Sequence, residues 1–424
     1  MIQPKLYHLS NGVPVIIDYL PGIEAVNVAV YVKSGSRNES NPADFGISHL
    51  MEHMALKGTK TRDASEITVA IENVGGVVNA YTGFNLTAYY ATVPVEHRSL
   101  AVNIIADVAQ NPIFPEQELE KEKLIVCQEL LTYEDLPEAV LEDKLCNTLF
   151  RGGMRHNIGG SFESVRAMTQ QQIAEFYKAR YSAKNSVIAI SGGGLENPVE
   201  ILAELESNFE RWALHDVDKY EFSNFVPGFC HTSKNDLSHT YFKLIWPVAP
   251  AIARDTLNVV DMFLAILGQG FGSRLFQEIR EKRGLVYSIG AGSMAFEDIG
   301  IASIEAQTSK TTVSETIHRI ADLCGKIKDG AEPLTAQELT RAKEMTKGAF
   351  RMGLVTPMRR ADFFATRSIQ FGGLDDVQQN LDWIDSVTLD QVRVATQEFF
   401  SQKPSIITLG IENELPLTEW QNLF

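Results

Sequence analysis

Two histidines and a glutamate stand in the order His49-x-x-Glu52-His53, within a segment whose apolar residues recur at helical spacing. On a helix, His49 and His53 lie one turn apart on the same face, so both imidazoles can reach one metal ion. Neutral imidazole suits Zn²⁺, which in catalytic sites keeps one coordination position open for water. Glu52 lies on the adjoining side of the helix, where its carboxylate can take the proton of that water. The pattern predicts a hydrolytic metal site.

A third protein ligand is expected from the acidic helix that begins at Pro115. Glu122 and Glu129 are seven residues apart and therefore share a face of that helix. One of them can bind the metal while the other supports a ligand. Most glutamates of such a segment simply face solvent. Spacing alone also leaves open which of Glu122 and Glu129 would bind the metal.

Elements that would hold these side chains follow from the periodicity of apolar residues. In the first half we expect strands at 13–17 and 25–33, the metal helix at 44–58, a helix at 65–72, two strands within 75–93, the acidic helix at 115–135, a helix at 171–177 and a strand at 186–191. In the second half we expect a strand at 241–248, a helix at 255–267, a glycine-rich break at 268–272, a helix through Arg283 and a strand pair within 285–306. The two strand pairs resemble each other, which indicates a weak internal repeat of about 210 residues and two related α+β domains.

Composition excludes several classes of protein. The chain has 424 residues, of which 44% are hydrophobic and 22% charged, so disorder and small disulfide scaffolds are excluded. Its formal net charge is −16 and no segment collects Lys and Arg, so neither nucleic acid nor membrane is an expected partner. The four cysteines show no C-x-x-C spacing and are expected to be reduced. Without a recognisable signal peptide or membrane span, the expected location is cytoplasmic.

The chain resembles the pitrilysin and mitochondrial-processing-peptidase family of zinc metallopeptidases, in its short bacterial two-domain form. H-x-x-E-H is the inverzincin arrangement, and the resemblance extends over nearly the whole chain, through LSNGVPVIID, GSRNES, GISHLMEHMALKGT, GGVVNAYTGFNLTAYYATV, CQELL and GSRLFQEIREKRGLVYSI. It implies an α+β fold of two structurally related α/β-sandwich domains, each a mainly antiparallel sheet packed by helices. We expect a zinc-binding catalytic domain at 1–215, a linker at 216–230 and a related domain at 231–424.

The resemblance also implies the zinc ligands. The family takes its third ligand from a glutamate at the distance of Glu129 from the second histidine, so one Zn²⁺ per chain is expected on His49, His53 and Glu129. Glu122 corresponds to the acid that supports this ligand set. His156 lies in a glycine-rich loop and is interpreted as a structural histidine.

Substrate contacts are implied in the same way. The strand that contains Asn79 and Ala80 corresponds to an exposed edge onto which substrate peptide adds as a further strand. Arg280 and Tyr287 correspond to a pair that grips the substrate backbone and supports the oxyanion. Spacing alone does not exclude Arg274 or Arg283 from the role given to Arg280.

The predicted function is a zinc-dependent endopeptidase that hydrolyses peptides or unfolded polypeptide segments through a metal-activated water, with Glu52 as general base. The alternative is a non-catalytic partner or scaffold subunit of a processing-peptidase-like complex. Because such subunits usually have a broken H-x-x-E-H or lack the Arg/Tyr pair, the intact motifs favour catalysis. Large relatives build a chamber from four such domains, so a chain with two is expected to form a homodimer.

Overall fold

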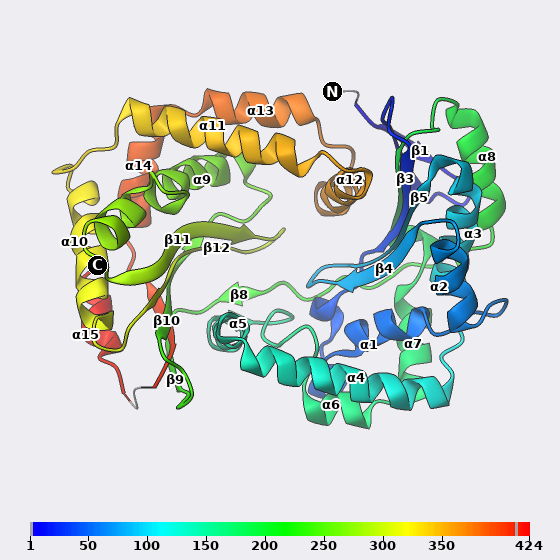
Figure 1. The fold of residues 1–424 in the computed structure, drawn as a ribbon, viewed down its shortest axis with the longest axis horizontal. Helices are drawn as coiled ribbons and strands as arrows, with labels where there is room; N and C mark the ends of the chain where they lie inside the picture. The colour runs from blue at the N-terminus through cyan, green and yellow to red at the C-terminus, as the bar shows by residue number, and fades with distance from the viewer. Residues whose placement is uncertain (1–2, 412–413) are drawn as a thin grey trace. The chain divides into compact units, whose positions relative to one another are not determined.

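Two compact units, each built around one sheet, make up the computed structural model, which describes residues 3–411 and 414–424 (Figure 1). Unit 1 contains the residues up to Thr132, followed by 152–221 and 351–377. Unit 2 contains residues 133–151, 222–350 and those from 378 onward. Each unit therefore combines segments that are distant in sequence.

Unit 1 has a six-stranded sheet in the order β1-β2-β7-β3-β5-β4. Its strands are β1 (Lys5–His8), β2 (Pro14–Tyr19), β3 (Ala25–Val32), β4 (Val77–Thr82), β5 (Thr87–Pro94) and β7 (Ser186–Gly192). All neighbouring pairs are antiparallel except β2 and β7. Strand β4 lies at one end of the sheet, so one side of it is an open edge.

Helices cover both faces of this sheet. They are α1 (Ile47–Ala55), α2 (Ala64–Glu72), α3 (Arg98–Gln110), the first part of α4 (Glu116–Asp135), α6 (Phe162–Ala167), α7 (Gln170–Arg180), α8 (Pro198–Phe209) and α12 (Pro357–Phe371). Figure 1 shows α2, α3 and α8 along one face and α12 against the other. Alternate residues of β3, Val26, Val28 and Val30, point into the core of the first face and are fully buried there.

A buried ion pair fixes α12 to the sheet. Arg360 Nε donates to Oδ2 of Asp18 at 2.6 Å and its Nη2 donates to Oδ1 at 2.8 Å. Ser191 Oγ also donates to Oδ2 of Asp18, at 2.6 Å. Since both charged residues are buried, this bidentate pair is shielded from water.

Unit 2 has a five-stranded sheet in the order β11-β12-β10-β13-β9 and a separate ribbon of two short strands. The sheet consists of β9 (Phe229–Ser233), β10 (Thr240–Val248), β11 (Val286–Ala295), β12 (Gly300–Thr308) and β13 (Ser405–Gly410), and the ribbon of β6 (Phe150–Arg151) and β8 (Asn224–Phe225). Its helices are α5 (Pro137–Leu149), α9 (Arg254–Gly268), a π-helix (Phe276–Glu281), α10 (Val313–Lys328), most of α11 (Ala336–Gly353), α13 (Val377–Ser386), α14 (Leu389–Phe399) and α15 (Leu417–Gln421).

The two sheets share one topology. The run β7-β3-β5-β4 of unit 1 matches β13-β10-β12-β11 of unit 2, and all pairs within both runs are antiparallel. Beyond this run, β2 lies parallel to β7 and β9 lies parallel to β13. The internal repeat and the expected fold class of two related antiparallel-rich domains packed by helices are therefore confirmed.

The compact units differ from the expected continuous ranges 1–215 and 231–424. One boundary between the units lies between Glu221 and Phe222, inside the expected linker. However, residues 133–151 belong to unit 2 and residues 351–377 belong to unit 1. Residues 133–151 belong to unit 2 because α5 packs on β13 and β10 and forms an ion pair from Glu142 Oε2 to Lys243 Nζ at 2.6 Å. Residues 351–377 belong to unit 1 because α12 packs on its sheet and forms an ion pair with β2. Local periodicity carries no signal for either long-range contact.

Two of the predicted helices are shorter than expected. The metal helix α1 starts after Gly46, which has a φ of 92°, and it ends at Ala55 instead of Gly58. The expected helix through Arg283 is a π-helix that ends at Glu281, where Lys282 N donates to the carbonyl of Gln277 five residues earlier.

Among the described residues, no helix is both long and apolar enough to cross a bilayer. The four cysteines are free, as expected, and Cys127 is buried in the core of unit 1.

Candidate metal centre

His49 and His53 lie on the same face of α1, as the spacing predicts. Leu50, Met51 and Met54 of this helix are fully buried in the core of unit 1, which fixes the helix about its axis. The histidines consequently project from the core toward α4, and each side chain is 15% exposed. Their ring centroids are 4.7 Å apart, with the rings inclined at 71°.

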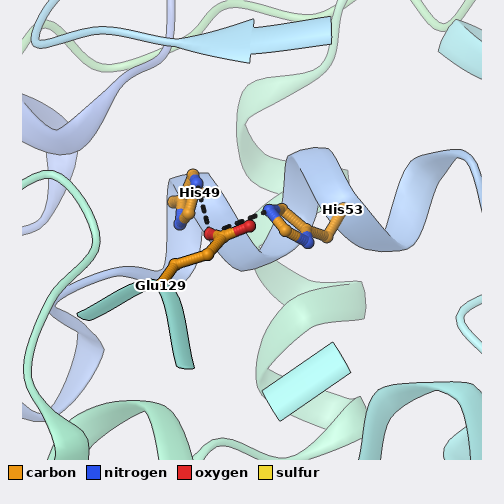
Figure 2. Close-up of side chains that lie close together, drawn as sticks. All are labelled: His49, His53 and Glu129. Atoms are coloured by element: carbon orange, nitrogen blue, oxygen red, sulfur yellow. Dashed lines mark ion pairs between the residues drawn. The ribbon is translucent and has the colours of Figure 1, made fainter. Parts of the chain in front are cut away.

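Glu129 of α4 and the two histidines form a group of three side chains whose geometry can hold a metal ion, here called the metal-binding group (Figure 2). Its Oε2 lies 3.7 Å from Nε2 of His49 and 3.6 Å from Nε2 of His53. One donor atom from each residue lies within 4.8 Å of the other two. The structure thus brings together the three residues predicted as ligands.

The donor set fits zinc. Tetrahedral coordination with bonds of about 2.1 Å places ligand atoms about 3.4 Å apart, close to the two distances measured from Glu129. Two imidazole nitrogens and one carboxylate are a typical protein ligand set of a catalytic zinc site. Three protein ligands also leave a fourth position for water or substrate.

Glu122 lies behind His53, away from Glu129. Its Oε2 accepts a hydrogen bond from Nδ1 of His53 at 3.0 Å, and Lys57 Nζ lies 2.8 Å from its Oε1. A carboxylate on Nδ1 fixes the ring orientation and leaves Nε2 as the free donor atom. This is the geometry expected of a supporting acid, whereas Glu129 approaches the Nε2 atoms of both histidines.

Glu52 contacts the end of the edge strand, and the charges of His53 and Glu129 act on its carboxylate. Thr82, the last residue of β4, donates from Oγ1 to Oε2 of Glu52 at 2.6 Å. Burial, helped by the negative charge of Glu129, raises the pKa of Glu52, although Thr82 and His53 oppose this shift. A raised pKa makes the ionised carboxylate a stronger base.

The two histidines have opposite pKa shifts. Burial, together with the neighbouring His53, lowers the pKa of His49 to about 4. Burial also disfavours charge on His53, but the hydrogen bond to Glu122 and the charges of Glu52 and Glu129 outweigh it and raise the pKa of His53 above its ordinary value of 6.5. In the metal-free protein, His49 is therefore neutral at neutral pH, and His53 holds its proton up to a higher pH than an ordinary histidine.

We expect zinc binding to release one proton per ion at a pH between these two pKa values. Zinc must displace the proton of His53, whereas His49 has none to lose, so affinity falls as the pH drops through the raised pKa of His53. Glu122→Gln should move this fall to lower pH, because it removes the hydrogen bond and charge that raise the pKa. Calorimetric titration of zinc in buffers of different ionisation enthalpy measures the released protons.

Glu116, an exposed residue on the same helix, provides the control for this titration as Glu116→Gln, which should behave like the wild type. Release of two protons would contradict a neutral His49. An unchanged pH dependence of zinc affinity in Glu122→Gln would contradict the role of Glu122 in raising the pKa of His53.

Asn79 and Ala80 lie on β4, at the open edge of the unit 1 sheet. The side chain of Asn79 is exposed, and its Oδ1 accepts a hydrogen bond from the backbone N–H of Ala80 at 2.8 Å. Because Thr82 on this strand contacts Glu52, the edge and the metal-binding group are directly connected within unit 1.

Arg280 and Tyr287 belong to unit 2, on the π-helix and on β11. The Arg280 guanidinium lies 4.9 Å from the ring centroid of Phe276 and 5.8 Å from that of Tyr287, whose side chain is 70% exposed. Among the described residues, no carboxylate forms an ion pair with Arg280. By contrast, the neighbouring arginines are both engaged, Arg274 with Glu338 and Arg283 with Glu278. These contacts favour Arg280 over its neighbours for the role of a free donor.

Sequence reasoning missed Thr82, Lys57 and Glu39 around α1, and it interpreted His156 only as a structural histidine. Thr82 and Lys57 contact Glu52 and Glu122, while Glu39 and His156 form a pair at the start of the helix. The sequence gives one indication for Thr82, because this residue ends the strand that contains Asn79. The other three become recognisable only through their contacts in the folded chain.

Comparisons with protein families match most of the chain. Residues 15–159 match the family described as insulinase (peptidase family M16), and residues 167–346 match the peptidase M16 inactive domain. An uncharacterized zinc protease of Rickettsia bellii is 29% identical over 406 residues, which cover 96% of this chain and 97% of that protein. One of Bacillus subtilis is 26% identical over 418 residues, covering 97% and 99%.

Solved structures show the same fold. A protease from Helicobacter pylori matches with a TM-score of 0.85 at 22% identity, covering 96% of this chain and 99% of that one. A peptidase M16 inactive domain from Pseudomonas fluorescens matches with a TM-score of 0.86 at 20% identity, covering 98% and 100%. At these identities the likeness establishes the two-domain fold.

Proposed function

Because the chain belongs to peptidase family M16 and is a zinc protease by that membership, we propose that it acts as an endopeptidase on peptides or unfolded polypeptide segments. The observation that carries this proposal is the position of Glu52. Its carboxylate is close enough to His53 and Glu129 for their charges to act on it, and it is hydrogen-bonded to the end of the edge strand. The proposed metal ligands, the proposed base and a strand that can hold an extended chain therefore all belong to unit 1.

His49, His53 and Glu129 would hold the zinc ion, and Glu122 would keep Nε2 of His53 directed toward it. Bound zinc supplies polarisation of the scissile carbonyl and lowers the pKa of the attacking water. Glu52 takes a proton from that water and later returns it to the leaving amine. Thr82 holds Oε2 of Glu52 by its hydrogen bond, which leaves Oε1 to carry the proton.

The edge of β4 would bind the substrate as an additional strand. Backbone hydrogen bonds supply the affinity in this mode, so it tolerates many sequences. The N–H of Ala80, which Asn79 holds in the free protein, is a donor that a substrate carbonyl can take over. A chain held along β4 passes Thr82 and reaches Glu52.

Arg280 and Tyr287 would supply donors to the substrate. We expect Tyr287→Phe and Arg280→Ala each to lower kcat/KM by about 10²-fold, because a donor directed at developing charge contributes on this scale. Zinc content should stay unchanged, since both residues lie outside the metal-binding group. Tyr241→Phe, which removes a hydroxyl elsewhere in unit 2, is the matched control. Unchanged kcat/KM in both variants would exclude the proposed role.

Metal analysis combined with cleavage of internally quenched peptides tests the function. The proposal requires hydrolysis that is lost on chelation and restored by zinc. Peptides blocked at both ends should be cut internally, since an endopeptidase needs no free terminus. A protein that binds zinc without any hydrolysis would instead be the non-catalytic partner or scaffold.

The active form is proposed to be a homodimer, because one chain supplies two of the four domains that form the chamber of large relatives. Sedimentation at working concentration should show twice the chain mass. Full activity of a strict monomer would contradict this.

A further inference from the structure

The first turn of α1 is capped by a carboxylate that lies before the helix in sequence. Glu39 is 2% exposed, and its Oε2 accepts a hydrogen bond from the N–H of Gly46 at 2.7 Å. Its Oε1 accepts one from the N–H of Ser48 at 2.9 Å. One buried side chain therefore holds two backbone donors at the start of the helix.

This helix cannot cap itself. The residue at its N-cap position is Gly46, which has no side chain to accept the free N–H groups of the first turn. The helix is only nine residues long, and His49 is its third residue. The negative charge of Glu39 at the positive end of the helix is also favourable. The segment that Glu39 orders is thus the segment from which His49 projects.

His156 orients Glu39 from the other side. Its Nε2 lies 2.9 Å from Oε2 of Glu39, and its ring stacks on Phe45 with the centroids 3.7 Å apart. An ionised carboxylate only accepts, so Nε2 of His156 is the donor. Nδ1 is buried and has no hydrogen-bond partner among the described residues, which agrees with a proton on Nε2. The histidine interpreted from sequence as merely structural therefore contacts the cap of the metal helix.

The loop that carries His156 packs directly on the start of α1. A Cβ added to Gly160 would lie 2.2 Å from the carbonyl oxygen of Phe45, and one added to Gly46 would lie 2.6 Å from that of Gly159. Both glycines also have positive φ, 77° and 92°, so the close backbone contact depends on them. A Cβ on Gly159 would lie 3.9 Å from Nδ1 of His49, which places this loop beside the ligand.

We propose that Glu39 and His156 are positioning residues that hold His49 in place for zinc. The inference rests on the proposed zinc site, but it concerns how that site is built. His53 has its own support in Glu122, whereas Nδ1 of His49 is buried without a hydrogen-bond partner among the described residues. His49 therefore depends on the backbone of the first turn, which Glu39 and His156 fix.

Zinc affinity of the full chain, measured by competition with a chromophoric chelator, tests this inference. Glu39→Gln places an amide N–H against a backbone donor, and His156→Leu removes the donor to Glu39. Each is expected to raise the Kd for zinc by about 10- to 100-fold, the range for losing support of a metal ligand. His156→Gln, whose amide nitrogen can replace Nε2, should recover most of the affinity. The visible spectrum of the Co²⁺-loaded protein should change in the two weak variants and not in His156→Gln.

Asp107→Asn is the matched control, because it alters another buried, multiply hydrogen-bonded carboxylate of unit 1, one that contacts Thr59, Thr61 and Arg62. It should lower stability and leave the Kd for zinc unchanged. Wild-type zinc affinity in Glu39→Gln and His156→Leu, or an equal loss in Asp107→Asn, would overturn the inference. A wild type that binds zinc but cleaves no peptide would refute the endopeptidase and leave this result intact, since the readout is binding.

Discussion

Glu52→Gln should lower kcat/KM by about 10²- to 10⁴-fold while zinc content stays at the wild-type level, because general-base catalysis contributes on this scale. Glutamine matches glutamate in size, and its amide oxygen can still accept the hydrogen bond from Thr82. What it cannot do is take a proton from water. The measurement pairs peptide hydrolysis with metal analysis of the same preparation.

Two further variants make the result specific to the base. Glu129→Gln should lose both zinc and activity, because it changes a carboxylate of the metal-binding group. Glu116→Gln, at an exposed position of the same helix, should keep both. If Glu52→Gln retains substantial turnover, Glu52 is not the general base, whatever happens to the zinc.

Arg360→Met should lower the free energy of unfolding by about 3–5 kcal/mol, the usual cost of removing one partner of a buried ion pair. The substitution leaves the buried carboxylate of Asp18 without its guanidinium, and the hydroxyl of Ser191 alone does not compensate. It also removes the ion pair that links α12, from the second half of the sequence, to β2 of the unit 1 sheet. Denaturant unfolding followed by circular dichroism measures the loss.

Arg359→Met, at the exposed neighbouring position, is the control and should have little effect. The double variant Asp18→Val/Arg360→Met should recover part of the loss, because no unpaired charge then stays buried. Equal stability of Arg360→Met and Arg359→Met would show that the pair does not hold α12.

Elements with strong local patterns were predictable from the sequence. The metal helix, the acidic helix and the strand pairs each show their own periodicity, and the two similar strand pairs indicated the repeat. The positions of α5 and α12 were not predictable, because each packs on a unit whose other strands lie elsewhere in sequence. Their apolar faces resemble those of any surface helix. The π-helix that carries Arg280 also lacks a distinct sequence pattern.

Some residues of the candidate site were likewise predictable from local sequence patterns, and others were not. The spacing of His49 and His53 placed both on one helix face, but it left Glu122 and Glu129 equivalent, and family resemblance made the choice. The contacts of Glu129 with both Nε2 atoms and of Glu122 with Nδ1 agree with that choice. The contact between Glu39 and His156 was not predictable from the sequence, because the two residues are 117 positions apart in the chain.

The open edges of the two sheets have a consequence for the protein itself. Strands β4 and β11 hold equivalent end positions, and an unpaired strand can pair with another copy of the same chain. The chain limits this risk locally: β11 carries a bulge between Val286 and Ser288, and on the short β4 the side chain of Asn79 occupies the N–H of Ala80. Loss of the Asn79 side chain would expose one more backbone donor, and strand-to-strand aggregation would then compete with productive use of this edge.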